Sequence, residues 1–120
     1  MVIIYGIPNC DTIKKTIHFF KRRGIEFCFH DFRKNGLETK LLKTWVKQVG
    51  LPKLLNKYST TWKALSPEEQ ADANAGTGYL KLMTQKPSLI KRPVIEWPDG
   101  SITTGFDEGL FLEKAAGPTT

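Results

Sequence analysis

The hydrophobic positions at the start of the chain predict a strand, a helix and a second strand. Residues Val2 to Tyr5 form an apolar run that ends at Gly6, which is typical of a short buried strand followed by a tight loop. From Asp11 to Arg23, apolar residues recur three and four positions apart and give one helical face, and a glycine follows as a stop signal. Residues Ile25 to Phe32 then alternate as a second strand does. This order predicts a parallel βαβ unit.

The middle of the chain is predicted to be helical, and strand signals return near its end. Helices are expected at residues 38–49, 52–55, 67–75 and 79–86. Strands at 93–97 and 101–104 flank a Pro-Asp-Gly turn and predict an antiparallel hairpin, which a helix at 106–115 follows. We therefore predict an α/β, thioredoxin-like fold with a mixed sheet. It forms a single domain over residues 1–120, with a helical insertion at about 37–87 and a frayed end at 117–120.

Composition is that of one folded domain in a reducing compartment. The 120 residues are 40% hydrophobic and 25% charged, and no secretory leader or membrane-length apolar run is visible. We expect a cytoplasmic protein whose two cysteines stay reduced. The net charge is +6, but Lys and Arg are scattered among segments that also carry Asp and Glu. This pattern favours a solvated basic surface over nucleic-acid binding.

Cys10 follows a loop and directly precedes the first predicted helix, where a thiol is readily activated. The first N–H groups of a helix lack internal partners and carry partial positive charge, which favours a thiolate. Thr12 is placed to donate its hydroxyl to the sulfur, and Lys14 lies one turn further along. His18 and Lys21 continue that stripe as a solvated helix face. A merely buried cysteine is the alternative, but the proline-containing loop favours a nucleophile.

The spacing of the cysteines predicts a monothiol mechanism. Cys10 is followed by Asp-Thr-Ile, so the Cys-x-x-Cys motif is absent. A thiolate that attacks a disulfide ends as a mixed disulfide, and the resolving thiol must then come from another molecule, for which we expect glutathione. Cys28 lies mid-strand and is expected to be inert and structural, although its pairing with Cys10 remains open. The Cys and His residues show no zinc spacing, and no metal site is expected.

The dipeptide Arg92-Pro93 precedes the predicted hairpin. Arginine offers a fixed cationic fork for an anion, and a cis proline at a strand start turns backbone groups toward a ligand. An edge-strand proline beside a surface arginine is the alternative interpretation.

Four motifs in order along the chain resemble the arsenate reductase (ArsC)/Spx family, most closely its YffB branch. They are Ile-Tyr-Gly-Ile-Pro-Asn-Cys-Asp-Thr-Ile-Lys-Lys, Phe-His-Asp-Phe-Arg-Lys-Asn-Gly-Leu, Leu-Leu-Asn-Lys with Thr-Thr-Trp, and Ile-Lys-Arg-Pro. The resemblance implies that Cys10 is the catalytic cysteine, that Arg92 contacts the oxyanion or thiol, and that Pro93 is the cis proline of thioredoxin-like folds. It also implies a glutathione-dependent thiol reductase.

Departures from the family pattern bear on the substrate. Asn56 and Gly105 stand where arsenate reductases of this type have two more anion-binding arginines, and Gly6 stands where they have a histidine. Each charge-assisted contact to an anion is worth about 1.5 to 3 kcal/mol, so arsenate is not the expected substrate. Ile13 replaces the second cysteine of the Spx redox switch, which disfavours a regulator that binds RNA polymerase. Both activities remain as alternatives.

The sequence thus predicts a monomeric oxidoreductase with no bound cofactor and with glutathione as co-substrate. Cys10 and Arg92 are the candidate catalytic residues, and Thr12, Lys14, Asn56 and Pro93 the candidate substrate-binding residues. The expected partners are glutathione and a thiol or disulfide substrate, with glutaredoxin as a further candidate and no membrane. Whether Asn56, Thr61 and Trp62 line the site stays open, and Tyr79, Leu82 and Met83 are expected in the core.

Overall fold

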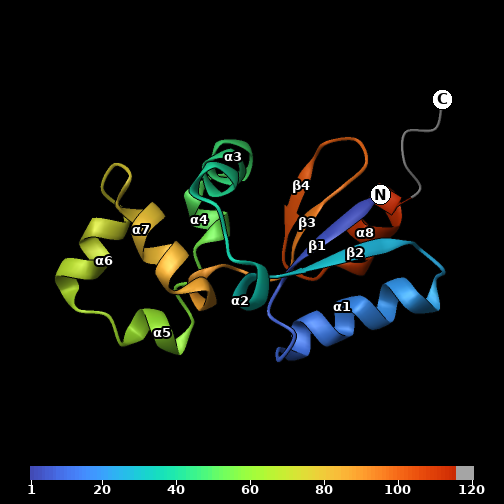
Figure 1. Ribbon diagram of the computed structural model, residues 1–120, viewed down its shortest axis with the longest axis horizontal. Coiled ribbons are helices and arrows are strands. Elements are labelled where there is room, and N and C mark those ends of the chain that lie inside the picture. Colours follow the sequence, from blue (N-terminus) through green and yellow to red (C-terminus); the bar gives the residue numbers. More distant parts are fainter. Residues whose placement is uncertain (116–120) are drawn as a thin grey trace. The chain divides into compact units, whose positions relative to one another are not determined.

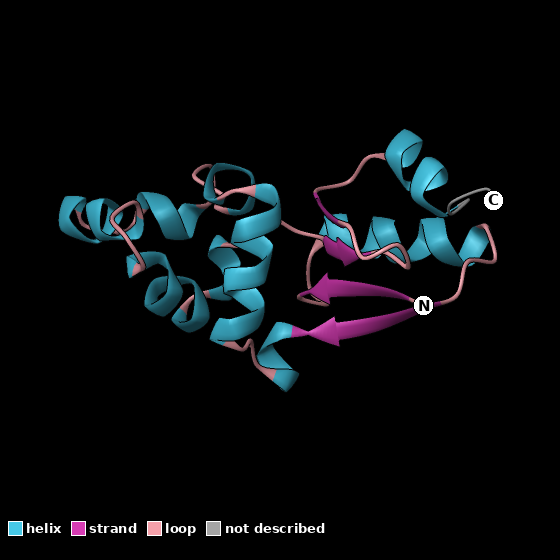
Figure 2. Ribbon diagram, turned by 90° about the horizontal axis from the view of Figure 1, so that it is seen from above, coloured by secondary structure: helices cyan, strands magenta, loops and turns pink. Residues whose placement is uncertain are grey.

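The computed structural model describes residues 1–115, so the frayed end expected at 117–120 lies outside the described residues. The chain divides into two compact units. The first contains Met1–Phe32 and the chain from Arg92 onward, and the second contains Arg33–Lys91. Strands β1 to β4 all belong to the first unit, whereas the second is built of helices (Figures 1 and 2).

The first unit contains a four-stranded mixed sheet in the order β2-β1-β3-β4. Strand β1 pairs in parallel with β2 and antiparallel with β3, and β3 pairs antiparallel with β4. The predicted βαβ unit, hairpin and α/β class are therefore confirmed. The strands are β1 (Val2–Gly6), β2 (Phe27–Asp31), β3 (Val94–Glu96) and β4 (Ile102–Thr104).

Helices α1 (Asp11–Arg22) and α8 (Glu108–Ala115) cover one face of this sheet (Figure 1). The core on that face is mainly aromatic, with Phe111 of α8 in contact with both phenylalanines of α1 and with the tryptophan after β3. Alternate residues of a strand point to one face, so β1 contributes two buried side chains, and Ile95 of β3 and Trp97 just after it contribute two more. The cluster consists of Val2, Ile4, Phe19, Phe20, Ile95, Trp97 and Phe111.

Tyr5 lies on the opposite face of the sheet. Its ring lies 5.0 Å from that of His30 and 6.4 Å from that of Phe32, and its hydroxyl donates a 3.0 Å hydrogen bond to Oε2 of Glu96. Burial, followed by this bond to a carboxylate, raises the pKa of Tyr5 well above its ordinary value. Tyr5 therefore stays a neutral donor that links β1 to β3.

The second unit packs short helices around its own buried side chains. Helix α6 begins with a capping box, in which the Ser66 hydroxyl accepts from the Glu69 N–H and the Glu69 carboxylate accepts from the Ser66 N–H. Fully buried residues of this unit include Leu42, Trp45, Leu54, Met83, Leu89 and Ile90. Its helices are α3 (Thr39–Val49), α4 (Leu51–Leu54), α5 (Thr60–Lys63), α6 (Pro67–Ala73), α7 (Gly78–Gln85) and the 3-10 turn η1 (Pro87–Leu89), preceded by α2 (Phe32–Asn35) at the junction.

Several boundaries differ from the sequence prediction for local reasons. The second strand stops at Asp31 because Phe32 already begins α2. The segment between the helices expected at 52–55 and 67–75 contains α5, because the Ser59 hydroxyl accepts from the N–H of Trp62 and starts a helical turn. The last helix begins at Glu108, after Asp107 accepts a hydrogen bond from the third N–H beyond it.

The basic charge is not spread evenly, contrary to the sequence interpretation. The second unit carries eleven Lys and Arg against four Asp and Glu, whereas the first carries seven against eight. The excess positive charge therefore belongs to the helical unit. In the described part of the chain, no helix is long and apolar enough to cross a membrane.

Candidate active site

The pairing of β1 with β3 brings the loop before Cys10 and the Arg92–Pro93 dipeptide to one edge of the sheet. Tyr5 pairs with Val94 in antiparallel register, so one further step places Gly6 opposite Pro93. Strand β1 leaves the sheet at Gly6 and reaches the helix within four residues. The candidate nucleophile and the candidate anion-binding arginine thus both lie at this edge of the first unit.

Cys10 is the N-cap residue of α1, as the sequence predicts for a thiol at a helix start. Its backbone is extended (φ −134°, ψ 128°), and its carbonyl accepts the first helical hydrogen bond from the Lys14 N–H at 3.0 Å. The side chain is half-buried and makes no capping hydrogen bond. The thiol is therefore accessible at the positive end of a twelve-residue helix.

The other candidates on α1 lie close to Cys10 in sequence but do not bond its sulfur. No hydrogen bond joins the Thr12 hydroxyl to the Cys10 sulfur among the described residues, whereas the Thr12 carbonyl accepts from Thr16 at 2.7 Å. Lys14 is exposed, one turn beyond Cys10. The expected donation from Thr12 to the thiol is thus absent in this structure, and Lys14 is left as a nearby exposed cation.

The Arg92–Pro93 peptide bond is cis, as the resemblance implied. Pro93 is buried, and its carbonyl accepts a 2.9 Å hydrogen bond from the N–H of Gly105, which follows β4 with φ +83°. Gly6 and Gly105 therefore flank the proline on its two sides and add no side chains there. Arg92 is half-buried, and its guanidinium forms no ion pair or hydrogen bond within the described part of the chain. The guanidinium is therefore available to bind an anion.

Gly6 is required by the packing of α1 against β1. A Cβ atom at Gly6 would lie 2.9 Å from Cγ1 of Ile13 and closer still to Cδ1. Ile13 is fully buried and has no room to withdraw. The glycine before the nucleophile loop and the isoleucine that follows the nucleophile by three positions are therefore complementary in size.

Cys28 is exposed on β2, so the expected structural role of this residue is wrong. It pairs with Ile3, while its neighbours Phe27 and Phe29 pack against the core on the other face. Ile3 lies three residues before the end of β1, about 10 Å from the edge where β1 turns toward Cys10. A disulfide needs Cα atoms within about 7 Å, so a Cys10–Cys28 bond does not fit this register.

The remaining candidates belong to the second unit. The Asn56 side-chain oxygen accepts from the Tyr58 N–H at 3.1 Å, and Asn56 lines a cavity of about 240 Å³. The Thr61 hydroxyl is hydrogen-bonded to that of Ser88 at 2.7 Å, and the Trp62 side chain is buried. Thr61 and Trp62 therefore contribute to packing within this unit.

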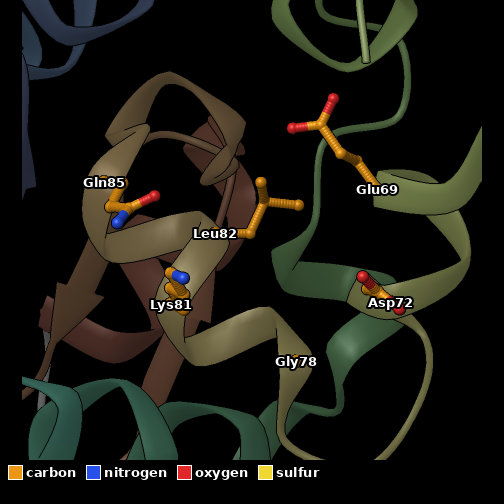
Figure 3. Close-up of a pocket in the computed structure, with 6 residues that line it drawn as sticks. All are labelled: Glu69, Asp72, Gly78, Lys81, Leu82 and Gln85. Carbon is orange, nitrogen blue, oxygen red and sulfur yellow. The ribbon is translucent and has the colours of Figure 1, made fainter. Parts of the chain in front are cut away.

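A second cavity, of about 230 Å³, lies between α6 and α7 and contains none of the predicted site residues (Figure 3). Glu69 and Asp72 come from α6, and Lys81, Leu82 and Gln85 from α7. Leu82 is half-buried and lines this cavity, whereas Tyr79 and Met83 lie in the core as predicted. Of the two carboxylates here, that of Glu69 already caps α6.

Comparison with known proteins agrees with this geometry. The ArsC family model matches residues 5–113. The chain belongs to the ArsC family. A solved structure described as the YFFB protein superposes with a TM-score of 0.88 at 30% identity, covering 96% of this chain and 99% of the other. The thioredoxin-like ArsC fold and the resemblance to the YffB branch are thereby confirmed.

Other ArsC-like relatives carry different descriptions. An arsenate reductase (ArsC) related protein of Brucella melitensis is 38% identical, with a TM-score of 0.74 over 93% of this chain and 92% of the other. An uncharacterized protein of Haemophilus influenzae is 40% identical over 90% of this chain and 93% of its own length. The regulatory protein MgsR of Bacillus subtilis is 29% identical over 91% of this chain and 86% of its own length. Membership of the family supports an oxidoreductase that works through a thiol.

Proposed function

We propose that this ArsC family protein is a glutathione-dependent thiol reductase whose single nucleophile is Cys10. The observation that carries the proposal is an accessible thiol at the start of α1 that no second cysteine reaches. Cys28, the other cysteine, lies on the face of the sheet opposite to α1. A thiol in this position forms a mixed disulfide that only an external thiol resolves.

The reaction takes place in two thiol–disulfide exchanges. The Cys10 thiolate attacks the glutathione sulfur of a substrate mixed disulfide, the substrate leaves as its thiolate and takes up a proton, and Cys10 becomes glutathionylated. A second glutathione, as thiolate, attacks the glutathione sulfur of that adduct, which releases glutathione disulfide and regenerates the Cys10 thiolate. The substrate sulfur is thereby reduced to a thiol and the sulfur of the incoming glutathione is oxidised to a disulfide, so one disulfide bond is exchanged for another.

Arg92 is assigned the binding of a glutathione carboxylate beside the thiolate. Its half-buried guanidinium forms no ion pair with another described residue, and an arginine fork suits a carboxylate in two-point contact. The cis Pro93 next to it holds the backbone at the sheet edge where β1 ends. Lys14 is exposed one turn further along α1.

The experiment is mass spectrometry after incubation with glutathione disulfide, using Cys10→Ser and Cys28→Ser as a matched pair. We expect one glutathione on the unsubstituted protein and on Cys28→Ser, and none on Cys10→Ser. Reduction of a glutathionylated peptide by glutathione is expected to disappear only in Cys10→Ser. An adduct confined to Cys28, or turnover that survives in Cys10→Ser, would contradict the proposal.

Arsenate reduction is the second candidate, because a 38% identical protein is described as related to arsenate reductase. The sheet edge beside Pro93 has Gly6 and Gly105 where that activity would use a histidine and an arginine, and the candidate cation there is Arg92. Arsenate-dependent oxidation of glutathione that is lost in Cys10→Ser would establish this activity.

Regulation of transcription is favoured only by the 29% identity to MgsR. Ile13 is fully buried and occupies the position that a redox switch would give to its second cysteine. Co-purification of RNA polymerase with both the unsubstituted protein and Cys10→Ser would support this activity.

A further inference from the structure

The basic residues of the first unit are concentrated on one helix. Residues 11–23, which comprise α1 and its C-cap, carry five Lys and Arg against one Asp. The rest of this unit carries two Lys and Arg against seven Asp and Glu. Opposite charges are therefore separated within one unit, and the positive charge belongs to α1. The five basic residues are Lys14, Lys15, Lys21, Arg22 and Arg23.

Four polar residues of α1 follow Cys10 along one side of the helix. A helix has about 3.6 residues per turn, so positions 14, 18 and 21 return to the side of position 10, and position 22 lies beside them. All four side chains are exposed, whereas the opposite side of the helix is buried in the core. At a rise of about 1.5 Å per residue, the last of them lies about 18 Å along the axis from Cys10. We call Lys14, His18, Lys21 and Arg22 the α1 stripe.

The cations of the α1 stripe have no partner within the described part of the chain. Their side chains form no ion pair or hydrogen bond there, whereas the other two basic residues of the segment lie over phenylalanine rings. A helix face that is only solvated gains from an acid three or four positions from each cation. Asp11 is so placed for Lys14, but no acid of the helix is so placed for Lys21 or Arg22. The charge of the stripe is therefore available to another molecule.

The start of the stripe beside a thiol decides the class of that molecule. A partner that reacts with Cys10 must carry an oxidised sulfur, which nucleic acids lack. Surfaces that bind single-stranded nucleic acid also place aromatic rings among their cations, but the aromatic residues of α1 are buried. A helix that lies on an anionic membrane inserts an apolar face, and the apolar side of α1 packs in the core instead. A polypeptide with acidic residues near an oxidised cysteine meets both requirements.

We propose that the α1 stripe docks an acidic segment of the protein whose mixed disulfide Cys10 attacks. This inference rests on the proposed function and deepens it, because it names the substrate class as polypeptides with Asp or Glu near the glutathionylated cysteine. An extended chain advances about 3.3 Å per residue, so acids about five residues from that cysteine reach Lys21 and Arg22. Glutathione is a tripeptide, about 10 Å long when extended, and does not span the stripe.

The test compares two glutathionylated peptides as substrates of the full-length protein, with glutathione as the reductant. Each peptide has three residues on either side of its cysteine, at about four to six positions from it, that are Glu in one peptide and Gln in the other. At an ionic strength of about 0.01 M, we expect kcat/KM to be about tenfold higher for the Glu peptide, since each exposed charge pair is worth up to about fivefold. At about 1 M salt, where charges are screened beyond about 3 Å, the two values are expected to agree.

The decisive variant is Lys21→Gln/Arg22→Gln, because these residues lie too far from Cys10 to touch the reacting sulfur. It is expected to lower kcat/KM about fivefold for the Glu peptide and less than twofold for the Gln peptide, whereas Lys21→Arg/Arg22→Lys is expected to retain both values. The matched control, Lys43→Gln/Lys47→Gln, removes the same charge from exposed positions on α3 of the second unit. An equal loss in this control would overturn the inference. Turnover that needs Cys10 but ignores the charge of the peptide would overturn the docking surface and leave the proposed function intact.

A binding measurement separates the docking surface from the chemistry. Labelled forms of both peptides, with serine in place of cysteine, are titrated by fluorescence anisotropy with the Cys10→Ser protein at low ionic strength. Preference for the Glu peptide that is lost when Lys21→Gln/Arg22→Gln is added would support the stripe even without turnover, and would then remove the reductase alone. Equal binding of the two peptides would overturn the inference. Tighter binding of an oligonucleotide or of phosphatidylserine vesicles, lost in the same variant, would also overturn it.

Discussion

Substitution of Gly6 by alanine tests whether the approach of α1 to β1 fixes the nucleophile loop. The added Cβ would lie 2.9 Å from Cγ1 of Ile13, a side chain with no exposed surface. Overpacking of this kind costs about 1 to 3 kcal/mol. Loss of glycine flexibility in the unfolded chain returns about 0.4 to 1 kcal/mol. The midpoints of these two ranges leave a net loss of about 1.3 kcal/mol in the free energy of unfolding.

The cause can be isolated with Ile13→Val, which removes Cδ1, the atom nearest to the added methyl group. Alone, this change is expected to cost about 0.5 to 1.5 kcal/mol. Combined with Gly6→Ala, it removes the closer of the two overlaps, so the double variant is expected to be at least about 0.5 kcal/mol more stable than the sum of the single effects. A coupling of this sign indicates direct steric contact.

The assay is urea unfolding followed by circular dichroism. Gly109→Ala serves as the matched control, because the nearest atom to its added Cβ is Oδ1 of Asp107 at 3.5 Å and the residue lies within α8. This control is expected to stabilise the protein by about 0.5 to 1 kcal/mol, since alanine favours a helix over glycine. Additive effects at Gly6 and Ile13, or a Gly6→Ala protein as stable as the unsubstituted one, would refute the argument.

Three further substitutions probe other parts of the fold by the same urea assay. Ser66→Ala removes the cap of α6 and is expected to cost about 1 kcal/mol, whereas Ser66→Thr should cost less; equal losses would argue against capping. Thr103→Val leaves the buried Trp97 Nε1 without its 2.9 Å acceptor and should lower the free energy of unfolding by about 1 to 3 kcal/mol. An unchanged free energy of unfolding would contradict a stabilising role for this hydrogen bond. Folding raises the pKa of Tyr5, so the neutral Tyr5 hydroxyl contributes to the free energy of unfolding below pH 10. This contribution is lost as the pH rises further, because Tyr5 loses its proton at lower pH in the unfolded chain than in the folded protein. Tyr5→Phe should therefore weaken the decline in unfolding free energy above pH 10, and an unchanged decline would disprove that origin.

The sheet and its two covering helices were predictable because each has a clear local period. The apolar run before Gly6 and the stripe that buries Phe19 and Phe20 carry enough signal to define β1 and α1. The short helix α5 was missed because a four-residue helix has too few positions for a period. Its start depends on a single capping hydroxyl, that of Ser59.

A residue of the candidate site was predictable only where its type and its position relative to a predicted helix or strand together indicate a chemical role. Cys10 at a helix start is such a case, and the structure places it there. The exposure of Cys28 was missed because alternation assigns two faces without saying which is covered. The cavity that Asn56 lines was not predictable, because the Leu55–Ile90 bridge joins segments that no local pattern connects.

The insertion of one unit into the other has a consequence for the order in which the chain folds during synthesis. The first unit needs the pairing of Tyr5 with Val94, so its sheet is incomplete until the ribosome has passed the second unit. Arg33–Lys91 is a continuous segment, and all of it is synthesised before Val94. Its ends attach beside Asp31 and Pro93, which flank Gly6 two strand spacings apart, or about 10 Å. Once folded, the helical unit acts as a short tether that lowers the entropy cost of closing the sheet. The surroundings of the Cys10 thiol are therefore completed last, when β3 pairs with β1.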